Sequence, residues 1–272
     1  MALTAALERL AEDASRGKLV IPSHAKVLLG VQRALDDPDC PIDKLCQLIS
    51  AEPVLSARVI SVANSVAYRR SGPIVAGVRN AVSRLGFRNV RTLAAAVLVR
   101  QMRDASTLPA HRDLARRLWE HSVHVAALGR ALAQRVLRKD PDAAFFAGIV
   151  HEAGGFYLIA RTADMPGLVD EARANWEGDA ESLIGGYVLR ALDVPAEVLS
   201  AADELWRGQP HAPPYSLGDA LCLADRLSPV ASPFAKPRPP SAAASALDDA
   251  NLKAALADSD FEVKSLVAAL NA

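Results

Sequence analysis

Apolar residues recur along most of the chain with the three- and four-residue spacing of helices that bury one face. The sequence contains no useful run with the two-residue period of a strand and no internal repeat. The pattern therefore predicts an all-α protein. Helices are predicted over residues 3–16, 22–35, 42–49, 53–64, 78–85, 87–102, 114–138, 165–175, 180–192, 196–206 and 217–227.

The stretch from Phe145 to Ala160 is nearly all apolar or small, with His151 and Glu152 side by side in its middle. Its composition predicts a buried helix, broken near Gly154 and Gly155, that is too short and too interrupted to cross a membrane. Burying a carboxylate and an imidazole costs several kcal/mol unless other groups pair with them. The sequence must therefore supply partners for this pair elsewhere.

Composition narrows the choice of protein class. Hydrophobic residues make up 51% of the 272 positions, enough for one large domain or two small ones. The net charge is zero, which gives no general attraction to nucleic acid or membranes. Three scattered cysteines suit a reducing compartment, and the N-terminus lacks the pattern of a signal peptide. We therefore expect a cytoplasmic protein.

Two polar stretches suggest how the chain is divided. Residues 104–112 form a polar connection around Pro109, which predicts a domain over residues 1–110 and another over residues 111–272. The segment 228–241 is proline-rich, which predicts a mobile linker or insertion within the second domain. The tail after residue 246 shows two short helical patterns.

Motifs in both halves of the chain resemble the HDOD family, the HD-related output domains of bacterial signal transduction proteins. The first half has an opening proline-serine helix, an acidic-proline helix that ends in Ala63-Asn64-Ser65, and a following helix pair with Asn80-Ala81 and Leu85-Gly86. The second half has matching stretches in the family's order. They are WEHSVHVA (119–126), FFAGIVHEAGG (145–155), LDVPAEVLSAADELW (192–206) and ALCLADRLS (220–228).

This resemblance implies an N-terminal helical bundle packed on a degenerate HD-type subdomain. In the wider HD superfamily, a His, a His-Asp pair and a later Asp hold divalent metal, which activates water for phosphoester hydrolysis. The corresponding positions here are His121, His151, Glu152 and Asp225. The resemblance thus makes these four residues a candidate site for Mn, Fe, Zn or Mg, with Glu152 and Asp225 as the catalytic carboxylates of an active enzyme.

The chain departs from the superfamily pattern in two respects. Glu152 replaces the aspartate of the His-Asp pair, and the added methylene moves the carboxylate by roughly 1.5 Å in a site that tolerates about 0.2 Å. No histidine lies between His151 and His211, where phosphodiesterases of the HD-GYP type have additional ones. A satisfied buried polar network is therefore the first interpretation of the four residues. A single weakly held metal and an active hydrolase are the alternatives.

Basic residues are concentrated in one part of the chain. Residues 69–117 contain eleven arginines and two acidic residues, and Arg84, Arg88 and Arg91 could form one stripe along neighbouring turns. The stripe could bind phosphate, as part of a nucleotide or a nucleic acid, or an acidic protein face. It could equally pair with the acidic remainder of the same chain. The absence of interleaved aromatic residues argues against single-stranded nucleic acid as a partner.

The sequence as a whole predicts a regulatory output or scaffold module without catalytic activity, which acts by binding a signalling protein or a ligand such as a nucleotide. The alternative from a different class is a metal-dependent phosphohydrolase that uses His121, His151, Glu152 and Asp225. An enzyme needs a pocket that reaches these residues, whereas a scaffold does not.

Overall fold

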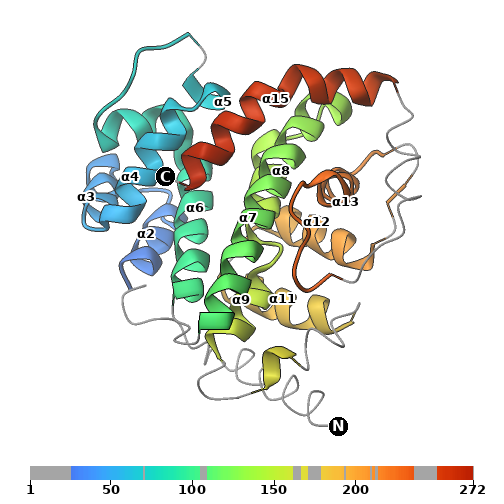
Figure 1. Cartoon of the computed structure of the whole chain (residues 1–272). Coiled ribbons are helices and arrows are strands. Elements are labelled where there is room, and N and C mark those ends of the chain that lie inside the picture. Colours follow the sequence, from blue (N-terminus) through green and yellow to red (C-terminus); the bar gives the residue numbers. More distant parts are fainter. Residues whose placement is uncertain are drawn as a thin grey trace. The chain divides into compact units, whose positions relative to one another are not determined.

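The computed structural model describes residues 26–69, 71–104, 109–161, 167–170, 179–192, 194–208, 210–211, 214–235 and 250–271. All regular elements within these ranges are helices, so the all-α prediction is confirmed (Figure 1). The helices are α2 (Lys26–Asp36), α3 (Ile42–Ser50), α4 (Pro53–Asn64), α5 (Val66–Arg69), α6 (Val78–Asp104), α7 (Pro109–Leu132), the π-helical turn η2 (Ala133–Leu137), α8 (Pro141–Val150), α9 (Ala153–Ala160), α11 (Asp179–Ala191), α12 (Ala196–Arg207), α13 (Leu217–Leu227) and α15 (Ala250–Asn271).

The chain divides into two compact units. One comprises residues 22–101 together with 258–272, and we call it the N-terminal unit. The other contains residues 102–257, and we call it the site unit. The sequence-based division differs from these units in two places, because it fell at residue 110 and kept residues 258–272 with the second domain.

The N-terminal unit is built from amphipathic helices whose apolar faces meet. Its core includes Leu28, Leu45 and Leu55, none of which is more than 1% exposed. The buried Arg58 on α4 donates a hydrogen bond of 3.0 Å to the carbonyl of Ala269. This bond satisfies one of the carbonyl groups that the last turn of α15 leaves unpaired.

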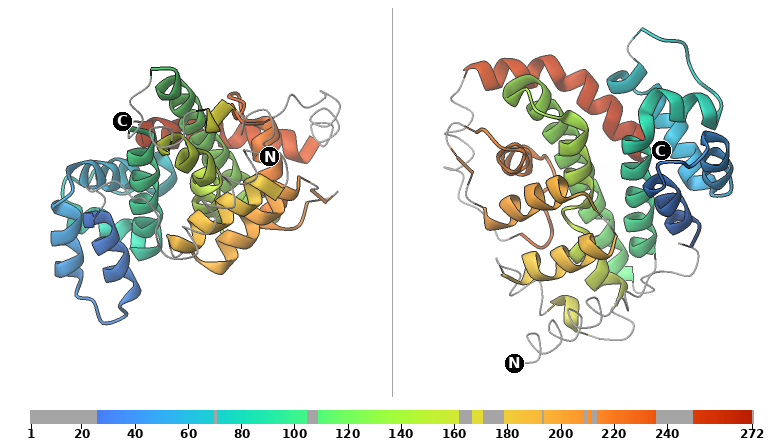
Figure 2. Two further views of the ribbon diagram at one scale, coloured as in Figure 1. Left: turned by 90° about the horizontal axis from the view of Figure 1, so that it is seen from below. Right: turned by 180° about the vertical axis from the view of Figure 1, so that it is seen from behind.

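The site unit is centred on α7 and α8, which lie side by side in both views of Figure 2. Their close approach requires a glycine, because a Cβ atom at Gly148 would lie 2.7 Å from the backbone nitrogen of Ala126 and closer still to its Cα. Real Cβ atoms essentially never come within 3.0 Å of another heavy atom. The absence of a side chain at Gly148 thus sets the distance between the helices that carry His121 and His151.

The break predicted near Gly154 and Gly155 is present but lies slightly earlier in the chain. The chain turns at His151 and Glu152 instead, and both glycines lie inside α9. They permit close packing: a Cβ at Gly154 would lie 2.9 Å from the backbone nitrogen of Gly185, and one at Gly155 would lie 3.0 Å from the Leu118 side chain. The two glycines therefore mark places where α9 packs closely against its neighbours. Local sequence rules cannot distinguish such glycines from those that break a helix.

The described part of the proline-rich segment also differs from expectation. Residues 228–235 pack onto the site unit, with Phe234 only 1% exposed and Ser232 buried. One buried aromatic side chain is enough to hold an irregular segment against a core, because it removes a large apolar surface from water. The rest of the segment, residues 236–241, lies outside the described residues. The C-terminal tail forms one helix, α15, where two short ones were predicted.

One helical stretch, Pro141–Ala160, is long and apolar enough by composition to cross a membrane. It comprises α8 and α9, and 94% of its apolar window is buried inside the protein. Burial of this extent is typical of a core segment.

Candidate functional site

The four predicted site residues come together in the site unit. His121 lies on α7, His151 and Glu152 form the turn between α8 and α9, and Asp225 lies on α13. The Nε2 atom of His121 is 3.3 Å from His151 Nε2, 3.3 Å from Asp225 Oδ1 and 3.8 Å from Glu152 Oε1. We call these four residues the quartet.

Local features of the sequence fix the turn that carries His151 and Glu152. Asp140 caps the start of α8 by accepting hydrogen bonds from two backbone N–H groups, and Pro141 occupies the first helical position. At the other end, the indole N–H of Trp206 on α12 donates to the backbone carbonyl of His151 over 3.2 Å. The helix start and the Trp206 contact together hold the turn in place.

A second polar cluster anchors α13, the helix that carries Asp225. The buried carboxylate of Asp219 accepts from the backbone N–H groups of His211, Tyr215 and Ser216 at 2.8–2.9 Å and contacts the His211 imidazole at 3.1 Å. Burial alone would raise the pKa of Asp219, but these hydrogen bonds outweigh it and lower the pKa to about 2. The ionised carboxylate therefore stabilises the start of α13.

Replacing Asp219 by asparagine should destabilise the protein by about 2 kcal/mol at pH 7. The folded-state pKa is depressed, so this contribution is present above the unfolded-state pKa, 3.8, and is lost as the pH falls toward 2. Urea unfolding at pH 7 and at pH 3 should show the gap between wild type and Asp219→Asn shrinking at the lower pH. The exposed Asp113→Asn variant is the control, and an equal loss in both variants would contradict the assignment.

Hydrogen bonds to the main chain determine which ring nitrogen of each histidine carries hydrogen. His121 Nδ1 lies 2.7 Å from the carbonyl oxygen of Val230, and His151 Nδ1 lies 2.8 Å from that of Gly148. A carbonyl oxygen can only accept, so both Nδ1 atoms must be protonated donors. In the neutral imidazoles, both Nε2 lone pairs then point into the same small volume.

The centre of the quartet therefore contains only acceptors unless a cation is added. The Nε2 lone pairs of His121 and His151 and the Glu152 Oε1 atom would face one another within 4 Å, and Asp225 Oδ1 lies 3.3 Å from His121 Nε2. Such a cluster is unstable in a low-dielectric interior without a positive charge. The charge is supplied either by an additional proton on a histidine or by a metal ion.

The electrostatic environments of the two histidines differ. Burial alone would lower the pKa of His121, but its hydrogen bond to Asp225 and the charges of Glu152 and Asp225 outweigh burial, so the pKa is raised. Burial lowers the pKa of His151, and the opposing charge of Glu152 does not restore it. If the cation is a proton, it resides on His121.

The donor set also fits a divalent metal. Two imidazole nitrogens bound tetrahedrally at about 2.1 Å would lie roughly 3.4 Å apart, close to the 3.3 Å between the Nε2 atoms. Glu152 Oε2 is buried and has no hydrogen-bond partner among the described residues, as expected for an oxygen available to an ion. His121, His151 and Glu152 could hold the metal, with Asp225 beside them.

The quartet is enclosed by the protein. His121 is 0% exposed, and His151 and Glu152 are each 3% exposed. Asp225 is slightly more open, with 10% of its side chain accessible. A molecule the size of a phosphoester cannot reach atoms with this exposure unless the surrounding helices move.

The predicted arginine stripe is engaged largely within the N-terminal unit. Arg84 donates to the carbonyls of Ala63 and Pro73, and Arg91 forms an ion pair with Asp36. Arg88 lies on the same helix, α6, and is also engaged in an interaction. These contacts favour the interpretation in which the basic face pairs with groups of the same chain.

Two residues at the quartet were missed by sequence reasoning. Val230 contributes only its backbone carbonyl, which leaves no signature in the sequence. Trp206 carries an indole N–H whose contact with His151 could have been suspected, because a buried tryptophan usually finds an acceptor.

Comparison with known families identifies the family of the chain. The family description of the HDOD domain matches residues 21–186, which is more than half of the chain. The chain belongs to the HDOD domain family. The HDOD match ends within α11, so it includes His121, His151 and Glu152 and leaves out Asp225. No curated protein is similar enough in sequence to count as a relative.

Solved structures share the fold over nearly the whole HDOD chain. A candidate metal-dependent phosphohydrolase from Shewanella amazonensis SB2B has 22% identity and a TM-score of 0.77, with 99% of this chain and 100% of that one covered. An HDOD domain protein of unknown function from Geobacter sulfurreducens has 22% identity and a TM-score of 0.62, with 97% of this chain and 96% of that one covered. A candidate signal transduction protein from Marinobacter aquaeolei VT8 has 18% identity and a TM-score of 0.58, with 98% of this chain and 66% of that one covered. At these identities, the likeness establishes the fold.

Proposed function

We propose that this HDOD protein is a non-catalytic output or scaffold module of bacterial signal transduction. It acts by binding another protein or a ligand, and the quartet is a buried polar centre that fixes α7, α8 and α13 relative to one another. The observation that carries the proposal is the enclosure of His121, His151 and Glu152. The proposed compartment is the cytoplasm, in keeping with Cys40, Cys46 and Cys222, none of which forms a disulfide.

Enclosure argues for this function because hydrolysis requires substrate and water at the reacting centre. A catalytic metal keeps one coordination position open, and its substrate must approach that position directly. A structural centre has no such requirement and gains from exclusion of water, since its charges interact more strongly in a low dielectric. Burial of the quartet is therefore expected for a scaffold.

Phosphoesterase assays test the proposal. Wild type and Glu152→Gln, which removes the charge at nearly constant shape, would be compared with bis(4-nitrophenyl) phosphate and 4-nitrophenyl phosphate in Mn²⁺, Mg²⁺ or Zn²⁺. We expect both proteins to give the rate of the metal solution alone. A metal-dependent rate in wild type at least tenfold above that of Glu152→Gln would overturn the proposal.

The second candidate function is a metal-dependent phosphohydrolase, and the convergence of four acceptor groups favours it. His121, His151 and Glu152 would hold the ion, with Asp225 beside them. A bound divalent metal would supply a water of lowered pKa and would polarise a phosphoryl oxygen. The hydrogen bonds from the Nδ1 atoms to Val230 and Gly148 would orient both rings for this purpose.

Elemental analysis distinguishes the two candidates. The protein would be purified without a nickel column, and its metal content would be compared with that of His151→Ala. The scaffold account predicts far less than one metal ion per chain in both proteins. About one Mn, Fe or Zn per wild-type chain, absent from the variant, would support the hydrolase instead.

A further inference from the structure

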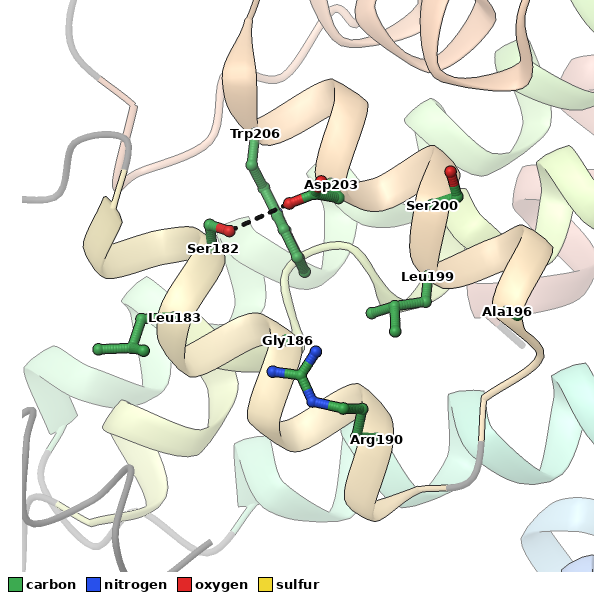
Figure 3. A pocket seen from close by; sticks show the side chains of 9 residues that line it. All are labelled: Ser182, Leu183, Gly186, Arg190, Ala196, Leu199, Ser200, Asp203 and Trp206. Atoms are coloured by element: carbon green, nitrogen blue, oxygen red, sulfur yellow. Dashed lines mark hydrogen bonds between the residues drawn. The ribbon is translucent and has the colours of Figure 1, made fainter. Parts of the chain in front are cut away.

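A pocket of about 440 Å³ lies between α11 and α12 in the site unit, and no role has yet been assigned to it (Figure 3). Its lining includes Trp206, Leu199, Arg190, Asp203 and Ser182. The volume is within the range of small-molecule sites, and the mixture of apolar wall and few polar groups is typical of them. The pocket is open to solvent on one side, unlike the quartet.

The apolar wall of the pocket is held rigidly. The indole N–H of Trp206 is already bonded to the carbonyl of His151 and the residue is only 7% exposed, so the small part of the ring that borders the pocket is apolar. Gly185 packs closely on the same ring, since a Cβ there would lie 2.6 Å from Trp206 Cζ2. Leu199 extends toward the space that Trp206 borders (Figure 3). A fixed apolar wall of indole and leucine atoms favours an aromatic ring as its partner.

The charged groups of the pocket favour an anion. The exposed Arg190 guanidinium lies 5.2 Å from the centroid of the Tyr187 ring, and no carboxylate pairs with it among the described residues. Asp203, the acidic residue of the lining, is paired with Arg207 and accepts from Ser182 over 3.2 Å. One arginine therefore remains to bind a carboxylate or phosphate, which its planar guanidinium does well.

We propose that this pocket binds a small aromatic anion, with the flat ring against Trp206 and Leu199 and the carboxylate or phosphate on Arg190. A nucleoside monophosphate and an aromatic carboxylic acid share this chemistry. Because Trp206 also contacts the carbonyl of His151, this one residue connects the pocket to the quartet. Ligand binding in this pocket does not depend on whether the quartet is catalytic, since none of the lining residues belongs to the quartet.

Calorimetric titration of the whole chain tests the proposal, with a chelator present so that metal binding does not contribute. The probes are AMP and 2-naphthoate as ring-bearing anions, adenosine as a ring without the charge, and ribose 5-phosphate as the charge without a ring. We expect at least one ring-bearing anion to bind at least tenfold more tightly than adenosine and ribose 5-phosphate. A preference for AMP would indicate a nucleotide, and a preference for 2-naphthoate would indicate an aromatic acid.

The variants make the proposal specific to this pocket. Arg190→Ala should weaken binding of the preferred anion at least tenfold, because it removes the cation of the lining that has no carboxylate partner among the described residues. Arg116→Ala, which removes an exposed arginine on α7, should change it by less than twofold. Failure of both anions to bind at about 1 mM, or equal binding by wild type and Arg190→Ala, would overturn the proposal.

Discussion

An alanine at position 148 should destabilise the protein by about 3 kcal/mol or more, because its Cβ has no space between α7 and α8. The atoms that it would meet are the backbone nitrogen and Cα of Ala126, which cannot rotate away as a side chain could. The two helices must move apart, which also separates His121 from His151. Urea unfolding of wild type and Gly148→Ala measures the effect.

Two further variants make the Gly148 prediction specific. Gly30→Ala places a methyl group inside α2 where no atom lies within 4 Å, so it should be neutral or stabilise by about 0.5 kcal/mol. Ala126→Gly should not rescue Gly148→Ala, since the closest atoms belong to the backbone. A loss below about 1 kcal/mol in Gly148→Ala would contradict the close helix approach.

Replacing His121 by alanine should cost about 3–5 kcal/mol of unfolding free energy. His121 lies between the carboxylates of Glu152 and Asp225, and its removal leaves two buried negative charges without a counter-charge. It also leaves a cavity in a fully buried position and an unpaired carbonyl at Val230. Thermal or urea unfolding at pH 7 measures the loss.

His124 provides a matched control for the His121 prediction. It lies on α7 three residues away, is only half-buried, and its ring bonds to the carbonyl of Glu120 in its own helix. His124→Ala should therefore cost less than about 1 kcal/mol. If the two variants lost equal stability, the quartet could not be the charge-balanced centre described above.

The sequence predicts most of the helices because the apolar spacing that defines them is a local property. The kink in α6 at Gly86, where φ is 75°, falls where the sequence predicts one helix to stop and the next to start. The members of the quartet were predicted by the family resemblance, since one histidine, an adjacent pair and a later aspartate are recognisable without a structure. What spacing alone could not give is that His151, Glu152 and Asp225 each place an atom within 4 Å of His121 Nε2.

The sequence could not predict the features that depend on tertiary contact. Gly154 and Gly155 suggest a helix break, yet they serve the packing of α9 against other parts of the site unit. The prolines around residues 229–233 suggest a mobile linker, yet the carbonyl of Val230 orients the His121 ring. A main-chain carbonyl and a glycine contact are both invisible to rules based on side-chain type.

Exchange of the histidine C2 hydrogen for deuterium, followed by mass spectrometry, tests the central claim that the quartet is closed to solvent. The chain supplies its own reference, because the His211 side chain is 55% exposed whereas those of His121 and His151 are 1% and 3% exposed. The account predicts exchange at His121 and His151 at least tenfold slower than at His211. Exchange at all three positions at similar rates would show an open site and contradict the scaffold function.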